Sequence, residues 1–260
     1  VGYGVQKKSD VTGAMARVGE KELKSMPVKN ALEGMQGKTA GVDITSSQRP
    51  GEVGDINIRG VRSIKAEQSP LYVVDGMVIQ NGGIENINPS DIESIDILKD
   101  ASATAIYGSR GANGVILVTT KKGKEGKVSI SVNTSMEFNQ PFILPRFQTR
   151  YGTGTGGKWV DGSSQSWGDK LSVSNYYGYN PKDDYFQTGI VNTESVSLST
   201  GTEKNQTFAS ASTTASEGII PNNKYQRHNF TVRNSTNFFD DRMTMDLGFS
   251  YVLQKDQNMM

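Results

Sequence analysis

The stretch GSRGANG (108–114) carries three glycines at three-residue intervals, and a turn of this kind could cradle a phosphate group. Phosphate loops place glycines where the main chain approaches the anion, and they lead from a strand into the N-terminus of a helix. This turn has the reverse order, because it follows a helical stretch and precedes the apolar run VILVTT. It also matches neither GxxxxGK[ST] nor GxGxxG, so we expect no phosphate site there.

Other residue types that carry catalysis or bind metals are sparse. His228 is the only histidine and cysteine is absent, which excludes histidine-based triads, clusters of histidine ligands and disulfides. Asp183 and Asp184 adjoin, but no D-x-D-x-D-G cage for calcium surrounds them. We therefore expect no catalytic residue, no metal site and no cofactor, and we place His228 on the polar face of a strand.

The composition narrows the class of protein. A net charge of +1, from 28 basic and 27 acidic residues, argues against a nucleic-acid-binding domain, which would be basic. No run approaches the roughly 18 apolar residues of a membrane-spanning helix, and a membrane β-barrel would show none either, because its strands alternate over short segments. The chain starts with VGYGVQKKSD rather than with Met or a signal peptide, which predicts a start within a longer protein or after processing.

Residues 1–126 predict a mixed α/β domain. A short helix is expected over 30–38, where NALEGMQGK stops at a glycine, and a two-turn helix between Asp100 as N-cap and Gly108 as C-cap. GVILVTTKK (114–122) is apolar on both faces, so this strand should be internal to its sheet. Short β-branched runs bounded by Gly, Pro and Asp predict the other strands: GVDITS (41–46), GDINIRG (54–60), PLYVVDG (70–76) and IESIDIL (92–98).

Residues 127–260 change to a period of two. In VSISVNTSMEF (128–138) and MTMDLGFSYVL (243–253) apolar side chains occupy one face and polar side chains mostly the other. About eleven alternating residues exceed the usual soluble strand and match a tilted membrane-spanning one. Three further strands, less cleanly patterned, are expected between them: ESVSLST (194–200), QTFASASTTAS (206–216) and YQRHNFTVRNSTNFF (225–239).

The connections between these strands sort by length. GTEKN (201–205) and DDR (240–242) are tight turns, EGIIPNNK (217–224) is longer, and about 139–191 form a long loop rich in aromatic residues, Gly and Ser. Short turns on one side and long loops on the other are typical of outer-membrane barrels, and a soluble β-sandwich gives a similar alternation. Five strands cannot close a membrane barrel, which starts at about eight, so the pattern predicts a fragment of a longer protein.

PLYVVDGM followed by NPSDIESIDILKDASATAIYGSRGANGVILVTTKKGK resembles the plug domain of TonB-dependent outer-membrane transporters, specifically of their SusC-like (SusC/RagA) branch. VGYGVQKKSDVTGA (1–14) resembles the stretch that follows the TonB box in that branch, and LEGMQGKTAGVDI and INIRG match its early plug. The resemblance is close over 1–126 and weaker over 127–260. It divides the chain into a TonB-box-proximal segment (1–12), a plug domain (13–126) and the first barrel strands (127–260).

The resemblance implies an α+β plug, a small mixed sheet with short helices, seated in a 22-stranded antiparallel transmembrane barrel. Gly108, Gly111 and Gly114 would then allow a tight turn where side chains would clash with neighbouring backbone, and Arg59 would anchor the plug to the barrel. The protein would lie in the lipid of the outer membrane. Its plug and N-terminus would be reached from the periplasm, and its long loops would be extracellular.

Family folds place the turns between the early plug strands toward incoming cargo. Six polar residues of these turns are candidates for touching substrate, and are equally suited to bonding the barrel wall: Arg49, Glu52, Arg62, Lys65, Gln80 and Asn81. Aromatic residues of the long loop are suited to stack on sugar rings, to dock a partner or to pack the loop: Trp159, Trp167, Tyr176 and Tyr177. The TonB-proximal residues are Val1, Gly2, Tyr3 and Gly4.

The function that the resemblance implies is not enzymatic. It is TonB-dependent active import of a large nutrient, with an oligosaccharide as the first expectation. The partners implied are a SusD-like surface lipoprotein that closes as a lid, TonB with its ExbB/ExbD energy coupling, and a glycan or peptide substrate. Two alternatives stay open, an oligopeptide importer of the same branch and a secreted β-rich adhesion module without transport.

Overall fold

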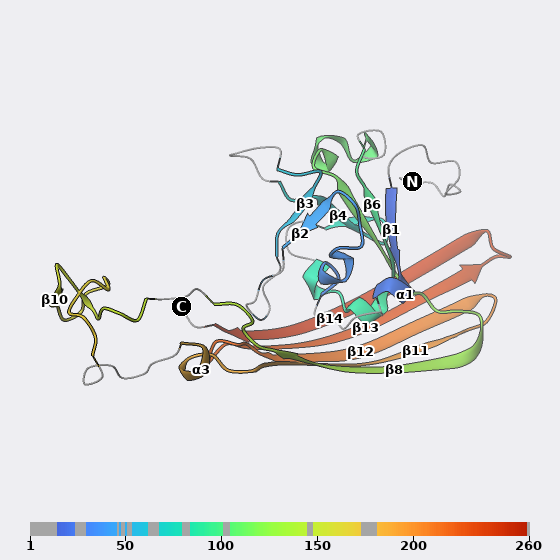
Figure 1. Ribbon diagram of the computed structural model, residues 1–260. Helices are drawn as coiled ribbons and strands as arrows, with labels where there is room; N and C mark the ends of the chain where they lie inside the picture. The colour runs from blue at the N-terminus through green and yellow to red at the C-terminus, as the bar shows by residue number, and fades with distance from the viewer. Residues whose placement is uncertain are drawn as a thin grey trace.

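The computed structural model of the chain contains a compact N-terminal unit that stands on one face of a long, curved β-sheet (Figure 1). The structure describes residues 15–23, 30–45, 47, 50, 54–61, 68–79, 84–100, 105–144, 148–172 and 181–258. None of the helices in this described part is long and apolar enough to cross a membrane.

The N-terminal unit is built on a five-stranded mixed sheet. Its strands are β1 (Met15–Gly19), β4 (Leu71–Val74), β5 (Met77–Ile79), β6 (Ile92–Leu98) and β7 (Val115–Thr120), in the order β1-β6-β7-β4-β5. The β4–β7 pair is parallel and the other pairs are antiparallel. β2 (Val42–Ile44) and β3 (Ile56–Ile58) form a separate antiparallel pair.

The core of this unit lies mainly against β6 and β7. Ile95, Ile97 and Ile116 are completely buried. Leu32 and Met35, from the segment that precedes β2 in the sequence, pack in the same apolar cluster. β7 lies between β6 and β4, which confirms the prediction that its two apolar faces make it an internal strand.

One of the two helices predicted for this unit is shorter than expected, and the other is only partly described. In place of a helix over 30–38 there is one 3-10 turn, η2 (Glu33–Met35), because Gly37 adopts φ +71° and the chain turns there. The second prediction, 100–108, falls partly outside the described residues, and its described part is the 3-10 segment η5 (Ala105–Gly111). The other short elements are α1 (Glu20–Leu23), η3 (Ile84–Asn86) and η4 (Pro89–Asp91).

The glycine turn has a different physical basis from the one predicted. Gly108 adopts φ +60°, and a Cβ added there would meet nothing within 4 Å, so its backbone conformation and not a clash favours glycine. Gly114 has φ +97°, and an added Cβ would lie 2.6 Å from the Cδ1 atom of Ile58. An added side chain at Gly114 would therefore clash with the core side chain of Ile58, whereas the prediction was a clash with neighbouring backbone.

This contact predicts a local loss of stability in Gly114→Ala. Forcing a methyl group against Ile58 should cost about 1–3 kcal/mol of overpacking, in addition to the strain of positive φ. Gly37→Ala is the matched control, because φ is +71° there and no atom lies within 4 Å of an added Cβ. Hydrogen exchange of the β7 amides in the full-length protein measures the difference. Equal exchange rates in the two variants would contradict the packing argument.

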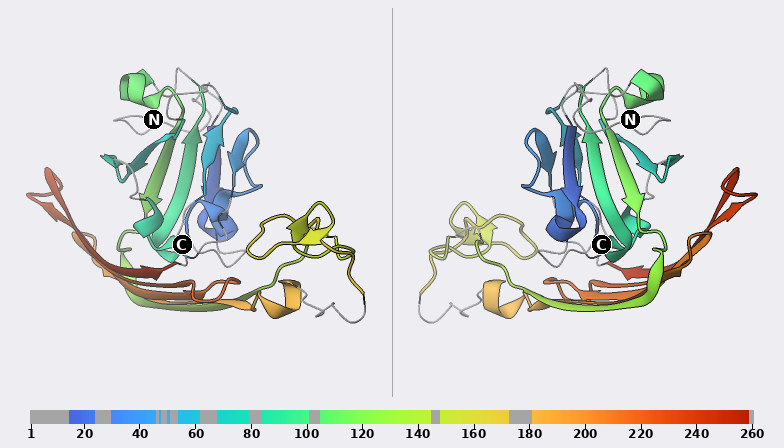
Figure 2. Two further views of the ribbon diagram at one scale, coloured as in Figure 1. Left: turned by 90° about the vertical axis from the view of Figure 1, so that its left-hand side faces the viewer. Right: turned by 90° about the vertical axis from the view of Figure 1, so that its right-hand side faces the viewer.

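The long sheet is a meander of five antiparallel strands, in agreement with the predicted pattern of turns. They are β8 (Gly126–Asn139), β11 (Gly189–Gly201), β12 (Asn205–Glu217), β13 (Lys224–Phe238) and β14 (Met243–Gln257). Short turns join β11 to β12 and β13 to β14, and the sheet curves around the base of the N-terminal unit (Figure 2). The connection from β8 to β11 contains β9 (Gly154–Thr155), β10 (Lys158–Trp159) and α3 (Pro181–Asp184).

The two faces of the long sheet differ in chemistry. Val132, Val196 and Phe230 are exposed on the face away from the N-terminal unit, and they occupy one cross-strand row. The opposite face carries buried polar residues such as Asn229 and Thr231. His228 is wrongly predicted on the polar face, because it shares the outward face with Phe230 and contacts Thr213 at 3.1 Å. The sequence misleads here because β13 is polar on both faces near this position.

Candidate functional site

The contact between the N-terminal unit and the long sheet is the feature with the most polar chemistry. The segment that contains η3 and η4 (84–91) rests on β11, β12 and β13. Asn229 Nδ2 donates a hydrogen bond of 2.5 Å to the carbonyl of Asn86, and the Arg227 guanidinium donates to the carbonyl of Glu85. Arg227 and Asn229 are both buried, so this part of the contact excludes water.

Asp91 lies at the centre of this contact. It is 2 % exposed, and Ser210 of β12 donates a hydrogen bond of 2.6 Å to its Oδ2 atom. Burial raises the pKa of the Asp91 carboxyl above its ordinary value, and the Ser210 hydrogen bond and the charges of Arg233 and Lys121 act in the opposite direction. We call the bonds that join 84–91 to β11–β13 the anchor contacts.

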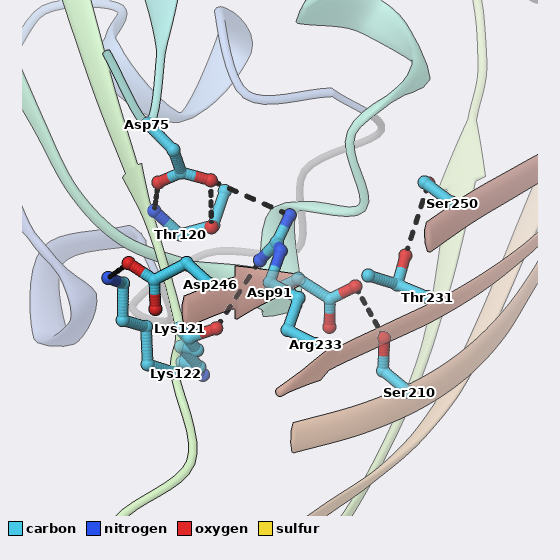
Figure 3. A network of polar contacts seen from close by, with 10 residues as sticks. All are labelled: Asp75, Asp91, Thr120, Lys121, Lys122, Ser210, Thr231, Arg233, Asp246 and Ser250. Carbon is cyan, nitrogen blue, oxygen red and sulfur yellow. Dashed lines mark hydrogen bonds and ion pairs between the residues drawn. The ribbon is translucent and has the colours of Figure 1, made fainter. Parts of the chain in front are cut away.

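A second group of contacts lies closer to β14 (Figure 3). Asp75 at the turn of the β4–β5 hairpin accepts hydrogen bonds from the backbone N–H and the hydroxyl of Thr120, at 2.9 and 2.5 Å. The same carboxylate lies 3.8 Å from the Arg233 guanidinium of β13. Lys122 Nζ lies 3.4 Å from Asp246 of β14, with more than half of each side chain exposed. We call the Asp75–Arg233 and Lys122–Asp246 pairs the hairpin contacts.

A cavity of about 500 Å³ separates the hairpin from β13 and β14. Asp75 and Arg233 line it together with Lys122 and Asp246, so both hairpin contacts lie at its wall. The N-terminal unit also contributes apolar side chains, including Val74, Met77 and Ile79. The long sheet is therefore in close contact with the N-terminal unit at 84–91 and is separated from it at the hairpin.

The link between the two units is held against the long sheet. A Cβ at Gly123 would lie 2.3 Å from the backbone N of Thr207, so only glycine permits this approach. Lys124 N donates to Ser199 Oγ at 3.0 Å, and Lys121 Nζ pairs with Glu20 at 2.8 Å. The end of β7 is thus fixed at the position where the chain enters β8.

The aromatic residues of the long connection lie on a small folded loop. Trp159 and Trp167 are 63 % and 64 % exposed, and the ring of Tyr151 lies 6.5 Å from that of Trp167. The backbone of Gly154 joins the segments, because it pairs with Trp159 and accepts a hydrogen bond from Trp167 N. The stretch GTGTGG (152–157) has GxGxxG spacing, but it contains β9 and the turn to β10 and is not followed by a helix, so it does not form a dinucleotide site.

Most of the predicted site residues fall outside the described residues. This holds for Arg49, Glu52, Arg62, Lys65, Gln80 and Asn81, for Tyr176 and Tyr177, and for Val1, Gly2, Tyr3 and Gly4. Trp159 and Trp167 are described and exposed. Arg59 forms an ion pair with Asp100 inside the N-terminal unit, and its predicted role in anchoring the plug to the barrel stays a prediction.

The contact between the N-terminal unit and the long sheet is non-covalent, so it can break and form again. Among the residues with described positions, no three His, Cys, Asp or Glu side chains gather in a way that could hold a metal ion. Hydrogen bonds from hydroxyls and amides, with a few ion pairs, can break and form again without covalent change.

Sequence reasoning missed Asp91, Ser210 and Arg233, and the one available signal was the position of Asp91 within the NPSDIESIDIL motif.

Comparison with known proteins identifies both parts of the chain. The family described as "TonB-dependent Receptor Plug Domain" matches residues 7–115. The chain is 36 % identical to the TonB-dependent receptor SusC of Bacteroides thetaiotaomicron, over 99 % of this chain and 26 % of that protein. It is 38 % identical to the TonB-dependent receptor P39 of Formosa agariphila, over 87 % of this chain and 22 % of that protein.

Solved structures show the same arrangement. The structure of the RagAB peptide importer in its open-open state superposes with a TM-score of 0.77 and 27 % identity, covering 99 % of this chain and 32 % of that chain. The chain spans about a quarter of the length of the curated relatives above.

Proposed function

The chain belongs to the SusC-like TonB-dependent receptors, and from this we propose that the whole protein imports a large nutrient, an oligosaccharide, across the outer membrane. The N-terminal unit is the plug, and the long sheet is part of the barrel wall. The relatives are receptors and transporters, and the chain is not an enzyme. The observation that carries the proposal is the 36 % identity to SusC over 99 % of the chain.

The arrangement of the two units supports a transport mechanism. A plug held by breakable polar contacts can shift when TonB pulls on its N-terminal segment, and the wall keeps its own backbone pairing throughout. The periplasm would lie at the end with the short turns, and the loop with Trp159 and Trp167 would be extracellular, as in other outer-membrane barrels. A SusD-like lipoprotein would close over that end as a lid. ExbB and ExbD would supply TonB with the energy of the proton-motive force.

The choice of an oligosaccharide as cargo rests on the SusC-like branch of the family and on the loop that carries Trp159 and Trp167. Trp159 and Trp167 each expose nearly two thirds of their surface. Flat indole faces suit the apolar faces of sugar rings, because both partners lose water on contact while the polar edges stay hydrated. The second candidate is an oligopeptide, and the observation that favours it is the similarity to RagAB, a peptide importer.

Uptake by cells tests the proposal. Cells that express the full-length receptor with its lid lipoprotein receive either a fluorescent mixture of plant oligosaccharides or a fluorescent casein digest. We expect internalisation of the sugars, and we expect it to stop when a protonophore removes the proton-motive force. Uptake of peptides alone would establish the second candidate, and protonophore-insensitive entry would contradict TonB dependence.

The loop provides a separate prediction. Replacing Trp159 and Trp167 with Ala should weaken cargo or lid binding by about thirtyfold, because each of the two exposed aromatic contacts contributes on the order of 1 kcal/mol. Barrel assembly should be unchanged, because loops sit on a rigid scaffold. Tyr151→Ala is the control for loop packing, because its ring touches Trp167 and is less exposed. Binding of the fluorescent oligosaccharides and co-purification of the lid are the measurements. If both are unchanged, the tryptophans only pack the loop.

A further inference from the structure

Among the described residues, the anchor contacts and the hairpin contacts between plug and wall differ in burial. At the anchor contacts the wall residues Ser210, Arg227 and Asn229 are all less than a tenth exposed. Ser210 donates to Asp91 at 2.6 Å and Asn229 donates to the carbonyl of Asn86, while the hydroxyl contact between Ser195 and Ser90 is longer, at 3.3 Å. At the hairpin contacts the charged atoms are 3.8 and 3.4 Å apart, and the side chains are partly or largely exposed.

Breaking the anchor contacts would be costly. A buried polar group that loses its partner keeps its desolvation penalty, and a buried charge keeps a larger one. Separation at this place would leave Asp91, Arg227 and Asn229 without their plug–wall bonds until water entered. Segment 84–91 therefore resists displacement.

Breaking the hairpin contacts would cost much less. The Lys122–Asp246 pair is more than half exposed, and water solvates such separated charges almost as well as the pair does. The Asp75 and Arg233 side chains are only 27 % and 21 % exposed, but their charged atoms are 3.8 Å apart, and Asp75 keeps its two hydrogen bonds from Thr120 when the pair separates. The cavity of about 500 Å³ already separates most of the hairpin from β13 and β14. Little close packing has to be lost when this gap widens.

We propose that cargo passes between the β4–β5 hairpin and wall strands β13 and β14, and that the plug pivots on segment 84–91, which stays attached. This inference rests on the proposed transport function. The Asp75–Arg233 pair is the bond that must open, because it bridges the hairpin and the wall beside the cavity (Figure 3). The lining is mixed, with the charges of Asp75, Lys122, Arg233 and Asp246 beside the apolar side chains of the hairpin. Such a passage suits a hydrated polar cargo that also has apolar faces.

Two reversible cross-links test this route in the full-length receptor. The sequence contains no cysteine, so each introduced pair is unique within these 260 residues. Asp75→Cys with Arg233→Cys ties the hairpin to β13, and Asp91→Cys with Ser210→Cys ties the anchor segment to β12. A short bis-methanethiosulfonate reagent joins each pair, and a reducing agent releases it. Uptake of the two fluorescent probes is measured before and after reduction, so each variant is its own control for folding.

The two cross-links should have opposite results. The tie between positions 75 and 233 should lower uptake about tenfold or more, with recovery on reduction, because the passage cannot open. The tie between positions 91 and 210 should leave uptake within about twofold of the reduced form, because that segment does not move. Full uptake with the first tie, or loss of uptake with the second, would overturn the inference.

Binding and wild-type uptake separate this inference from the function on which it rests. Cargo binding at the cell surface should be the same in the tied and released forms of both variants, since only passage is affected. Loss of binding in the first tied form would overturn the inference, because the tie would then act on the cargo site. A wild-type receptor that takes up neither probe would contradict the proposed transport function itself.

Discussion

We expect uptake to stop in Val1→Pro/Tyr3→Pro, while cargo binding and barrel assembly should continue. The two positions lie in the segment predicted to be TonB-proximal, outside the described residues, and are two apart in the sequence. In an extended segment, residues two apart direct their N–H groups to the same side. TonB is expected to add this segment to its own sheet edge, where main-chain hydrogen bonds provide the affinity. Proline lacks the N–H group, so the double variant loses two adjacent bonds of the ladder.

Val1→Ala/Tyr3→Ala is the matched control for this experiment. It removes the same side chains and keeps both N–H groups, so uptake should stay close to that of the wild type. Proton-motive-force-dependent uptake in cells that carry the proline variant would rule out strand addition at these residues. Equal loss in both variants would show that TonB reads side chains there.

Leu247→Arg should destabilise the assembled barrel by about 2–4 kcal/mol, because β14 then presents a charge to lipid near the midplane. Leu247 is exposed and shares a face with Phe249 and Tyr251, the face directed away from the plug. The loss of stability is measured as the change in the free energy of unfolding in lipid vesicles. This is obtained by titrating with urea and following the gel band of the folded barrel, which shifts on heating.

Ser250→Arg is the control on the other face of the same strand. Ser250 lies opposite Thr231, with the two hydroxyls 3.3 Å apart, and lines the cavity between plug and wall. An arginine there reaches polar surroundings, so the loss should be far smaller than at Leu247. Equal losses at the two positions would remove the lipid-facing assignment of β14.

The local pattern of the chain predicted most of the strands. Alternation over 128–138 and 243–253 predicted β8 and β14, and the β-branched runs predicted β4, β6 and β7. These strands could be predicted because the pattern of apolar and polar side chains that decides which face is buried repeats within a few consecutive residues. The helix expected over 30–38 was wrong because Gly34 and Gly37 weaken a segment that lacks enough turns to compensate.

The plug–wall contacts could not be predicted from local pattern. Asp91 and Ser210 are 119 residues apart, and neither belongs to a motif that names its partner. The pairing depends on the register of β12 and on the position where the plug stands, and both are properties of the assembled fold. His228 shows the same limit, because a strand with polar residues on both faces does not reveal which face points outward.

The inner face of the wall is lined with small hydroxyl side chains where it meets the plug, and this affects how the plug moves. Ser212, Thr214 and Thr231, which lie outside the anchor contacts, are all buried there. A hydroxyl rotates freely and can donate or accept, so a new partner can replace a lost one after a small shift. A guanidinium or carboxylate requires a more fixed geometry. Beyond its pivot, a plug sliding over this surface would therefore meet a nearly level free-energy profile, and the wall would oppose it with little friction.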